Sequence, residues 1–431
     1  MTPLRVCMLS VHTCPLATLG GKETGGMNVY VRDLSRELGR RGVLVDVFTR
    51  LQDPSRRRVS DRLGYGGRVI HVEAGPAAPY NKYAIYDHLD EFTAGVEEFA
   101  RAEGIQYDII HSHYWLSGVV AKALRERWQI PFVQMFHTLG HMKNAVAQRA
   151  EEEEPPLRIA VEGDLMAQAD ALVAATPLEK AQMTWLYGAD PERIVVIPCG
   201  VDLEQFVPMP RAQAKECLGL PQNQRLILYV GRIEPLKGID TLLHAIARVV
   251  QRCPECRRGL SVSIVGGEPH APAEQMDAEM ARLQALRAEL GISEVVTFRG
   301  ASAQDILSCY YSAAEVVVVP SHYESFGMVA LEAMACGTPV IASKVGGMTF
   351  TVQDGVTGFH IPFRDHEELA DRIEQILLDG ELQIRLGRQA AQWASQYSWT
   401  RVADQVQLLY NGVRRRECLP AVRSSLQIEV G

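Results

Sequence analysis

The stretch LYVGRIEPLKGID, residues 228–240, decides how this chain folds, because it carries a buried strand directly into a helix. Leu226–Val230 is a short apolar run of the kind found in buried parallel strands. Arg232 follows this strand, and Lys237 stands where the helix is expected to begin. Ligands of open α/β sheets bind at the carboxyl ends of the strands, so two cations there suit a diphosphate. The alternative is that Arg232 and Lys237 are ordinary surface charges without a ligand.

Apolar segments of the same kind alternate with helical patterns on both sides of this stretch. In the second half, the further predicted strands are Val262–Val265, Val295–Phe298, Val316–Val319, Val340–Ala342 and Phe359–Ile361. In the first half, they are Val6–Ser10, Val43–Thr49, Val69–Val72, Asp108–His111, Phe132–Phe136, Ala171–Ala174 and Ile194–Ile197. The alternation predicts two tandem α/β domains, each doubly wound and Rossmann-like, with a cleft between their sheets.

The boundary between the domains is expected near residue 208, in a proline-rich segment that runs from Pro198 to Pro221. The N-terminal domain would then comprise residues 1–208, and the C-terminal domain residues 209–399. The segment 400–431 comes after the second sheet is complete, and its helix over Thr400–Arg415 has an apolar face. We expect that helix to pack back on the first domain.

The composition is typical of a soluble globular protein. The net charge of −8 argues against broad nucleic-acid binding, which needs a basic face. We expect no transmembrane helix and no targeting segment, and therefore a cytoplasmic protein. Cys253 and Cys256 are the only close pair among nine scattered cysteines, so we expect reduced thiols rather than a disulfide or a metal site. The acidic run Glu151–Glu154 precedes two prolines and is expected to be a solvated loop or the edge of a lid.

The first strand leads into the loop VHTCPLATLGGKETGGMNVYV, residues 11–31. Gly20–Gly21 and Gly25–Gly26 lie in this loop, before a helix that is expected to begin near Met27. Glycines let backbone N–H groups come close to an anion, and a helix N-terminus favours negative charge. A flexible turn is the alternative. The loop matches neither GxGxxG nor the P-loop pattern, so it gives no support for NAD or ATP binding.

Two strands of the first half end in histidines. His111 and His113 lie in DIIHSHYWLSG, and His137 and His141 lie in FVQMFHTLGHMKN. Carboxylate partners at metal-ligand spacing are missing, so we expect no metal site here. A histidine at a strand end that faces a cleft is better suited to hydrogen bonding with a substrate.

The stretch SHYESFGMVALEAMACG, residues 321–337, places Glu324 and Glu332 eight positions apart. Paired carboxylates are typical of glycosidases, in which one is the acid and the other the nucleophile. Here, however, Glu324 is expected in the loop before a helix and Glu332 inside that helix. The N–H groups of Phe326–Val329 would face the cleft and bind an anion. Each glutamate is then better placed to accept hydrogen bonds from hydroxyl groups.

Together, Gly231–Arg232, Lys237 and the two glutamates with FG between them resemble the signature of the retaining family-4 glycosyltransferases of the GT-B fold. The resemblance covers nearly the whole chain. It implies a hexosyltransferase that uses a nucleotide sugar and requires no cofactor or metal. The catalytic residues that it implies are His137, Arg232, Lys237 and Glu324. The donor-binding residues that it implies are Gly26, Gly266, Arg299, Phe326, Gly327, Met328, Val329 and Glu332.

The same resemblance implies a role for each group. Arg232 and Lys237 would hold the donor diphosphate and neutralise it as it leaves. Glu332 would accept hydrogen bonds from the ribose, while Glu324 and His137 would bind the transferred sugar. The expected donor is a UDP-sugar, with an ADP-sugar as the alternative.

Relatives that use phosphorylated acceptors bind the acceptor phosphate in a basic cluster of the N-terminal domain. The matching positions here are Lys82, Tyr114, Thr138, Lys143 and Arg158, and together they favour a small phosphorylated acceptor. FHTLGH and HYESFG resemble sucrose-phosphate synthase, which joins glucose to fructose 6-phosphate, and this is the preferred interpretation. HTCPL, GGMNVYV and HSHYWLSG resemble the enzyme that joins N-acetylglucosamine to inositol phosphate in the mycothiol pathway, which is the alternative. Ser325 departs from the proline that is usual in the synthase.

Two hypotheses from other classes remain. A glycoside hydrolase or phosphorylase would need Glu324 and Glu332 to face the same anomeric carbon. A nucleotide-sugar sensor would bind the donor and transfer nothing. The sequence does not indicate the oligomeric state.

Overall fold

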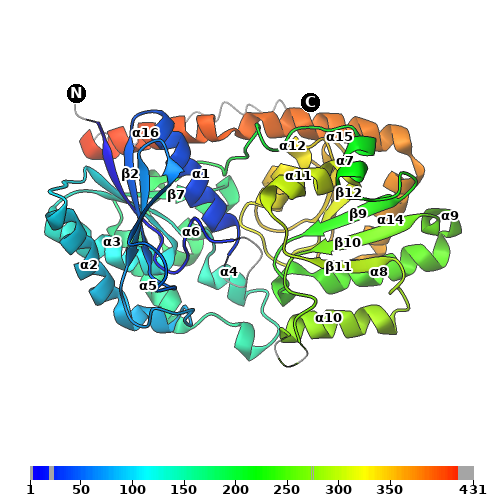
Figure 1. The fold of residues 1–431 in the computed structure, drawn as a ribbon, viewed down its shortest axis with the longest axis horizontal. Coiled ribbons are helices and arrows are strands. Elements are labelled where there is room, and N and C mark those ends of the chain that lie inside the picture. Colours follow the sequence, from blue (N-terminus) through cyan, green and yellow to red (C-terminus); the bar gives the residue numbers. More distant parts are fainter. Residues whose placement is uncertain (1–2, 19–23, 273, 275, 416–431) are drawn as a thin grey trace.

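The computed structural model describes residues 3–18, 24–272, 274 and 276–415, and shows two α/β lobes side by side (Figure 1). The sheet of the N-terminal lobe has eight strands in the order β3-β4-β2-β1-β5-β6-β7-β8. These strands are β1 (Arg5–Leu9), β2 (Leu44–Arg50), β3 (Val59–Gly64), β4 (Gly67–Val72), β5 (Ile109–His113), β6 (Phe132–Met135), β7 (Ala171–Ala174) and β8 (Ile194–Val196). The reversal of strand order beside β1 is that of a doubly wound sheet.

The sheet of the C-terminal lobe has six parallel strands in the order β11-β10-β9-β12-β13-β14. They are β9 (Arg225–Val230), β10 (Leu260–Val265), β11 (Val296–Gly300), β12 (Ala314–Val319), β13 (Val340–Ser343) and β14 (Gly358–Ile361). Every strand expected in the sequence is present, and its ends differ from the expected ones by at most two residues. The expected fold class of two doubly wound α/β sheets is confirmed.

The sequence patterns missed strand β3. It pairs antiparallel with β4 through a tight turn at residues 64–67, where Tyr65 has a φ of 52°. Its segment VSDRLG has a polar, exposed centre because it lies at the edge of the sheet. An edge strand needs no apolar run, so the pattern typical of buried strands does not detect it.

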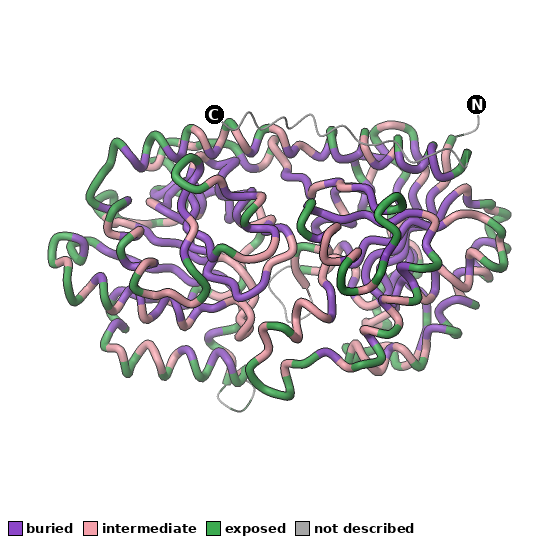
Figure 2. The backbone as a smooth tube through the Cα atoms, turned by 180° about the vertical axis from the view of Figure 1, so that it is seen from behind, coloured by how far each residue is buried: buried purple, intermediate pink, exposed green. Residues whose placement is uncertain are grey.

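Helices cover both faces of each sheet. In the N-terminal lobe they are α1 (Gly26–Arg40), α2 (Leu89–Ala102), α3 (Tyr114–Trp128), α4 (Gly140–Asn144), α5 (Pro156–Gln168) and α6 (Pro177–Tyr187). From the predicted boundary onward they are α7 (Arg211–Cys217), α8 (Ile239–Arg252), α9 (Pro254–Arg257), α10 (Ala278–Glu289), α11 (Gln304–Ala313), α12 (Met328–Ala335), α13 (Met348–Thr351), α14 (His366–Leu378), α15 (Gly380–Ala394) and α16 (Trp399–Arg415). Figure 2 shows the consequence, with buried strands inside and exposed residues along the outer helices.

Strand residues alternate between the two apolar layers of each lobe. In β1, Val6 and Met8 belong to the layer that holds α1 and α16, whereas Cys7 and Leu9 belong to the layer that holds α2 and α3. This alternation follows from the two-residue period of a strand. Because both faces are covered, the carboxyl ends of the strands are the places where polar groups can meet a ligand. No helix in the described ranges is long and apolar enough to cross a membrane.

Helix α16 returns from the C-terminal lobe and packs on the N-terminal lobe, where it runs along the upper edge in Figure 1. The hydroxyl of Tyr410 lies 2.7 Å from Nδ1 of His111. At the end of the helix, Arg414 pairs with Asp108 at 2.7 Å. The expected segment 400–431 is therefore seen on the first lobe up to residue 415, and its remainder, residues 416–431, lies outside the described residues.

Cys253 and Cys256 form a disulfide, so the expectation of reduced thiols is wrong for this pair. The single turn of α9 brings their Cα atoms to 5.2 Å, within the range that a disulfide spans. The sequence showed the spacing, but not that the residues between the cysteines form a helical turn. The other described cysteines are free thiols, namely Cys7, Cys14, Cys199, Cys217, Cys309 and Cys336.

Candidate active site

A cavity of about 250 Å³ opens between the lobes, where the carboxyl ends of the two sheets face each other. Most of the residues expected at the site line it: Gly26, Lys82, Tyr114, His137, Thr138, Lys143, Arg232, Lys237, Glu324, Phe326, Gly327, Met328 and Val329. Gly26 lies close to the opposite lobe, since a Cβ atom there would be 3.3 Å from Sδ of Met328. The other expected residues, Arg158, Gly266, Arg299 and Glu332, do not line this cavity.

The C-terminal lobe contributes two cations after β9. Lys237 ends a short 3-10 turn, Pro235–Lys237, rather than starting the next helix as expected. Its Nζ donates to Oε2 of Glu324 at 2.6 Å, and Nη1 of Arg232 pairs with Glu234 at 2.9 Å. The two predicted cations, Arg232 and Lys237, thus both line the cavity, and each is paired with a neighbouring carboxylate.

The loop after β12 places Glu324 at the N-terminus of α12. Gly327 precedes this helix in the left-handed region, with a φ of 89°, and no side chain caps the helix. A second loop supports the turn, since the N–H of Gly347 donates to the carbonyl of Glu324 at 2.7 Å. A Cβ atom on Gly346 would lie only 2.1 Å from that carbonyl oxygen, so this close approach requires glycine. The uncapped helix start therefore faces the cavity as a site for negative charge.

Glu332 lies one turn along α12 from Met328, and its side chain is buried. Its Oε2 accepts a hydrogen bond from the hydroxyl of Tyr311 at 2.7 Å. Burial raises the pKa of Glu332 to about 7, and nearby Asp33 adds to the effect. The expected role of Glu332 in holding a ribose stays a prediction.

Replacing Glu332 by glutamine is expected to stabilise the protein in a pH-dependent manner. A carboxyl group with a raised folded pKa destabilises the folded state as the pH rises from its unfolded pKa, about 4.5, through its folded pKa of about 7. The gain for Glu332→Gln should therefore be absent near pH 4 and reach about 2–3 kcal/mol at pH 8. Urea denaturation at both pH values measures this. Glu381→Gln, on the exposed start of α15, is the control, and a gain equal at both pH values would contradict the prediction.

Gly266 directly follows β10 and Arg299 lies on the neighbouring strand β11, and neither lines the cavity. A Cβ atom on Gly266 would come within 1.9 Å of the carbonyl oxygen of Gly231, so glycine is required for the two strand ends to meet. Arg299 is exposed, and its Nε lies 3.4 Å from Oγ of Ser263. The structure therefore places the Arg299 side chain alongside the sheet, near Ser263 on β10, rather than in the cavity.

Three histidines extend from the cavity into the N-terminal lobe: His137 is half-buried and lines the cavity, whereas His113 and His111 are fully buried. Nδ1 of His113 lies 3.0 Å from Nε2 of His137, and His111 contacts Tyr410. Burial lowers the pKa of both His137 and His111 to about 3, so these rings are neutral at ordinary pH. His137 has a φ of 62°, which is uncommon for a residue other than glycine and is typical of functional sites. His141 lies apart from these three, 4.8 Å from the ring of Tyr187.

No cluster of three or more potential metal ligands occurs among the residues that the structure describes. The expected loop glycines Gly20–Gly21 lie outside those residues. The two later glycines, Gly25–Gly26, precede and begin α1, whose N-terminus faces the cavity. Asn28 holds this turn by accepting from the N–H of Gly25 at 2.9 Å.

The sequence missed several lining residues, chiefly His12, Thr13, Asn28 and Tyr323. The motif that contains TGGMN identified the loop but not which of its side chains face inward. Glu154 was also missed: it was assigned to a solvated acidic loop, yet it is buried against Lys143 and Arg158. The sequence of an acidic run does not show which of its side chains is buried. The one signal available was the spacing of four residues between Glu154 and Arg158, which is typical of an ion pair.

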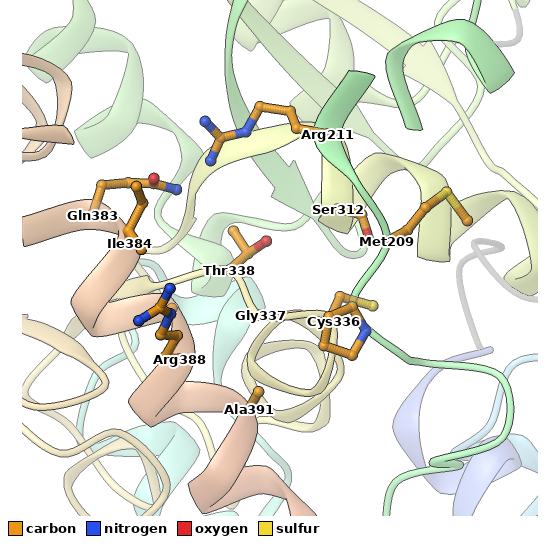
Figure 3. A pocket seen from close by; sticks show the side chains of 12 residues that line it. Met209, Arg211, Ser312, Cys336, Gly337, Thr338, Gln383, Ile384, Arg388 and Ala391 are labelled. Carbon is orange, nitrogen blue, oxygen red and sulfur yellow. The ribbon is translucent and has the colours of Figure 1, made fainter. Parts of the chain in front are cut away.

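A second cavity, of about 380 Å³, lies between the linker at residues 208–211, the far end of α12 and helix α15 (Figure 3). Arg211 and Arg388 border it, and Arg211 pairs with Glu315 at 2.9 Å. None of the residues expected at the site lines this second cavity. It adjoins the C-terminal end of α12, whereas Met328 and the interlobe cavity lie at the N-terminal end. The interlobe cavity is therefore the candidate active site.

Comparisons with known proteins agree with this geometry. Residues 24–205 match the family described as Glycosyltransferase Family 4, and residues 210–393 match Glycosyl transferases group 1. The D-inositol 3-phosphate glycosyltransferase of Saccharomonospora viridis is 42% identical over 99% of this chain and 97% of its own. Its counterpart from Frankia alni is 44% identical over 91% of this chain and 96% of its own.

Solved structures show the same fold. The sucrose-phosphate synthase of Thermosynechococcus elongatus superposes with a TM-score of 0.87 at 35% identity, and the match covers 96% of this chain and 100% of that one. HepE of Anabaena, solved with UDP and glucose, has a TM-score of 0.72 at 21% identity, covering 94% of this chain and 98% of that one. The chain is a hexosyltransferase and belongs to the family-4 glycosyltransferases of the GT-B fold.

Proposed function

We propose that this enzyme transfers N-acetylglucosamine, with retention of configuration, from UDP-N-acetylglucosamine to an inositol phosphate. The observation that carries the proposal is the name shared by relatives above 40% identity along nearly the whole chain, D-inositol 3-phosphate glycosyltransferase. Sucrose-phosphate synthase, which the sequence motifs favoured, is a neighbour at 35% identity, so that interpretation is less well supported. The motif around Tyr323 belongs to the C-terminal lobe and bears little on the acceptor, whereas the motif around His137 includes Thr138, which would serve either phosphorylated acceptor.

The charges of the cavity fit such a transfer. Arg232, Lys237 and the N-terminus of α12 would receive the negative charge that develops on the leaving diphosphate. Glu324 would exchange its contact with Lys237 for hydroxyl groups of the transferred sugar. His137, held neutral by burial, would donate or accept a hydrogen bond near the reacting carbon without adding charge.

The acceptor would enter from the N-terminal lobe. Lys82 and Lys143 line that side of the cavity together with the hydroxyl-bearing Tyr114 and Thr138. Two cations and two hydroxyls suit a phosphate monoester. The lobes would have to exclude water from the donor, because water is a competing acceptor.

Sucrose-phosphate synthesis remains the second candidate, supported by the TM-score of 0.87 and by the tyrosine before Glu324. Fructose 6-phosphate would then replace the inositol phosphate, and glucose would come from UDP-glucose or ADP-glucose. Its phosphate suits the same cluster, so the site residues are shared by the two candidates.

The test is a matrix of donors and acceptors. The enzyme is incubated with UDP-N-acetylglucosamine, UDP-glucose or ADP-glucose, each with inositol 3-phosphate or fructose 6-phosphate, and products are identified by mass spectrometry. We expect product chiefly from UDP-N-acetylglucosamine with inositol 3-phosphate. A disaccharide phosphate formed only with fructose 6-phosphate would establish the second candidate, and release of free sugar in every mixture would overturn both.

A further inference from the structure

Arg158 was expected to bind the acceptor phosphate, but all of its N–H groups are already engaged. Its Nε donates to Glu162 at 2.7 Å. Nη1 donates to the hydroxyl of Tyr114 and pairs with Glu154, each at 3.0 Å. Nη2 donates to the carbonyl and the hydroxyl of Thr138, at 2.7 and 3.0 Å. A guanidinium has five such hydrogens, so Arg158 can contact a phosphate only if one of these partners leaves.

Glu154 holds the same donors that a phosphate would need. One of its carboxylate oxygens accepts from Lys143, and the other accepts from the hydroxyl of Tyr83 at 2.7 Å and pairs with Arg158. The side chains of Glu154 and Arg158 are 1% and 0% exposed, so solvent does not screen this cluster. The Glu154 carboxylate, with two cations and a hydroxyl around it, therefore has the same kind of surroundings that a bound phosphate would have.

Glu154 carries a full negative charge under ordinary conditions. Burial alone would raise its pKa, but Arg158, Lys143 and Lys82 together lower the pKa to about 2. A phosphate bound to Lys143 and Arg158 would therefore lie directly against a carboxylate. Two anions cannot share these donors without strong repulsion, so one must leave when the other arrives.

The backbone at Glu154 is anchored, which limits the movement to the side chain. The N–H of Glu154 donates to Oδ1 of Asn144 at 2.7 Å, and its carbonyl accepts from Nδ2 of Asn144 at 3.2 Å. Pro155 follows at once, before α5 begins. Rotation of the Glu154 side chain is then the simplest way to release Lys143 and Arg158.

We propose that Glu154 is a resident anion of the acceptor phosphate subsite, which the phosphate group of the acceptor displaces from Lys143 and Arg158. The identity of the acceptor rests on the proposed function, whereas the exchange of anions does not. Glu154 thereby sets the affinity for the acceptor: it keeps the buried cations neutralised while the subsite is vacant and weakens the binding of any competing anion.

The direct test measures binding of inorganic phosphate by calorimetry to the full-length enzyme and to Glu154→Gln. Glutamine keeps the shape but removes the competing charge, so we expect phosphate to bind about tenfold more tightly, a difference of about 1.4 kcal/mol. Glu153→Gln, on the exposed neighbour, is the control and should bind phosphate like the natural enzyme. Glu154→Asp, whose carboxylate is shorter by one methylene, should give a smaller gain and serves if the glutamine variant does not fold.

The outcomes separate this inference from the proposed function. In turnover assays, Glu154→Gln should lower KM for inositol 3-phosphate about tenfold and give no gain for unphosphorylated inositol. Weaker or unchanged phosphate binding in both Glu154 variants would overturn the inference, since Glu154 would then only position Lys143 and Arg158. A gain in phosphate binding without transfer to inositol 3-phosphate would uphold the anion exchange and overturn the proposed acceptor instead.

Discussion

Replacing Lys237 or Arg232 by alanine is expected to lower kcat/KM about 100- to 1000-fold. Both side chains line the cavity at the end of β9, where the diphosphate of a nucleotide sugar would leave. Charge on that group increases in the transition state, so a cation beside it stabilises the transition state more than the bound donor. Most of the loss should therefore appear in kcat rather than in KM.

Initial rates measured over a range of donor concentrations separate these two constants. Lys122→Ala provides a matched control, because Lys122 also pairs with a carboxylate, Asp164 at 2.8 Å, but lies outside the cavity. Its kinetic constants should stay within about twofold of the natural enzyme. Near-normal turnover in both Lys237→Ala and Arg232→Ala would rule out the proposed role of the two cations.

Arg299 gives a sharper comparison within the same lobe. The family resemblance assigned it to the donor, yet its side chain is exposed and lies along the sheet face near Ser263. Arg299→Ala is therefore expected to change kcat/KM by less than about threefold, as is usual for a surface position. A loss comparable to that of Lys237→Ala, measured by the same rates, would show that Arg299 reaches the donor.

The sequence predicted those parts of the fold that depend on a local and repetitive pattern. A buried parallel strand is apolar over most of its length, so the apolar parts of β9 and β12 were recognised and only Arg225, Ala314 and Glu315 at their starts were left out. The carboxyl ends of such strands must bear the ligand, which located Arg232 and Glu324 at the cavity. The edge strand β3 escaped because it is half exposed and its pattern is polar.

Features that depend on three-dimensional neighbours could not be predicted in the same way. The left-handed backbone at Tyr114 and His137, with φ of 74° and 62°, is enforced by surrounding packing rather than by glycine. Nor does the sequence reveal that one glutamate of the run 151–154 is buried, because that depends on Lys143 and Arg158 lying on separate helices that converge on it. Contacts with residues of other elements, rather than the residue types themselves, determined both the left-handed backbone at Tyr114 and His137 and the burial of Glu154.

Replacing Arg158 by methionine is expected to lower the free energy of unfolding by about 3–5 kcal/mol. Arg158 is the shared partner of two buried carboxylates, Glu154 and Glu162. Methionine fills similar space but leaves both of them with fewer positive neighbours. A buried charge that loses its partner is far less stable than an exposed one, whereas an exposed pair contributes little. Arg149→Met is the matched control: this exposed arginine pairs with Glu152 at 2.8 Å, and its loss should cost less than about 1 kcal/mol.

Urea denaturation across pH tests the cause of this loss. In the natural protein the pKa of Glu154 is depressed to about 2, so its contribution to stability is present above its unfolded pKa of about 4.5 and is lost as the pH falls toward 2. The difference between Arg158→Met and the natural protein should therefore narrow in acid. Adding Glu154→Gln and Glu162→Gln to Arg158→Met should restore most of the stability at pH 7, since no buried charge then remains unpaired. If the triple variant is no more stable than Arg158→Met alone, the loss arises from packing and not from the two carboxylates.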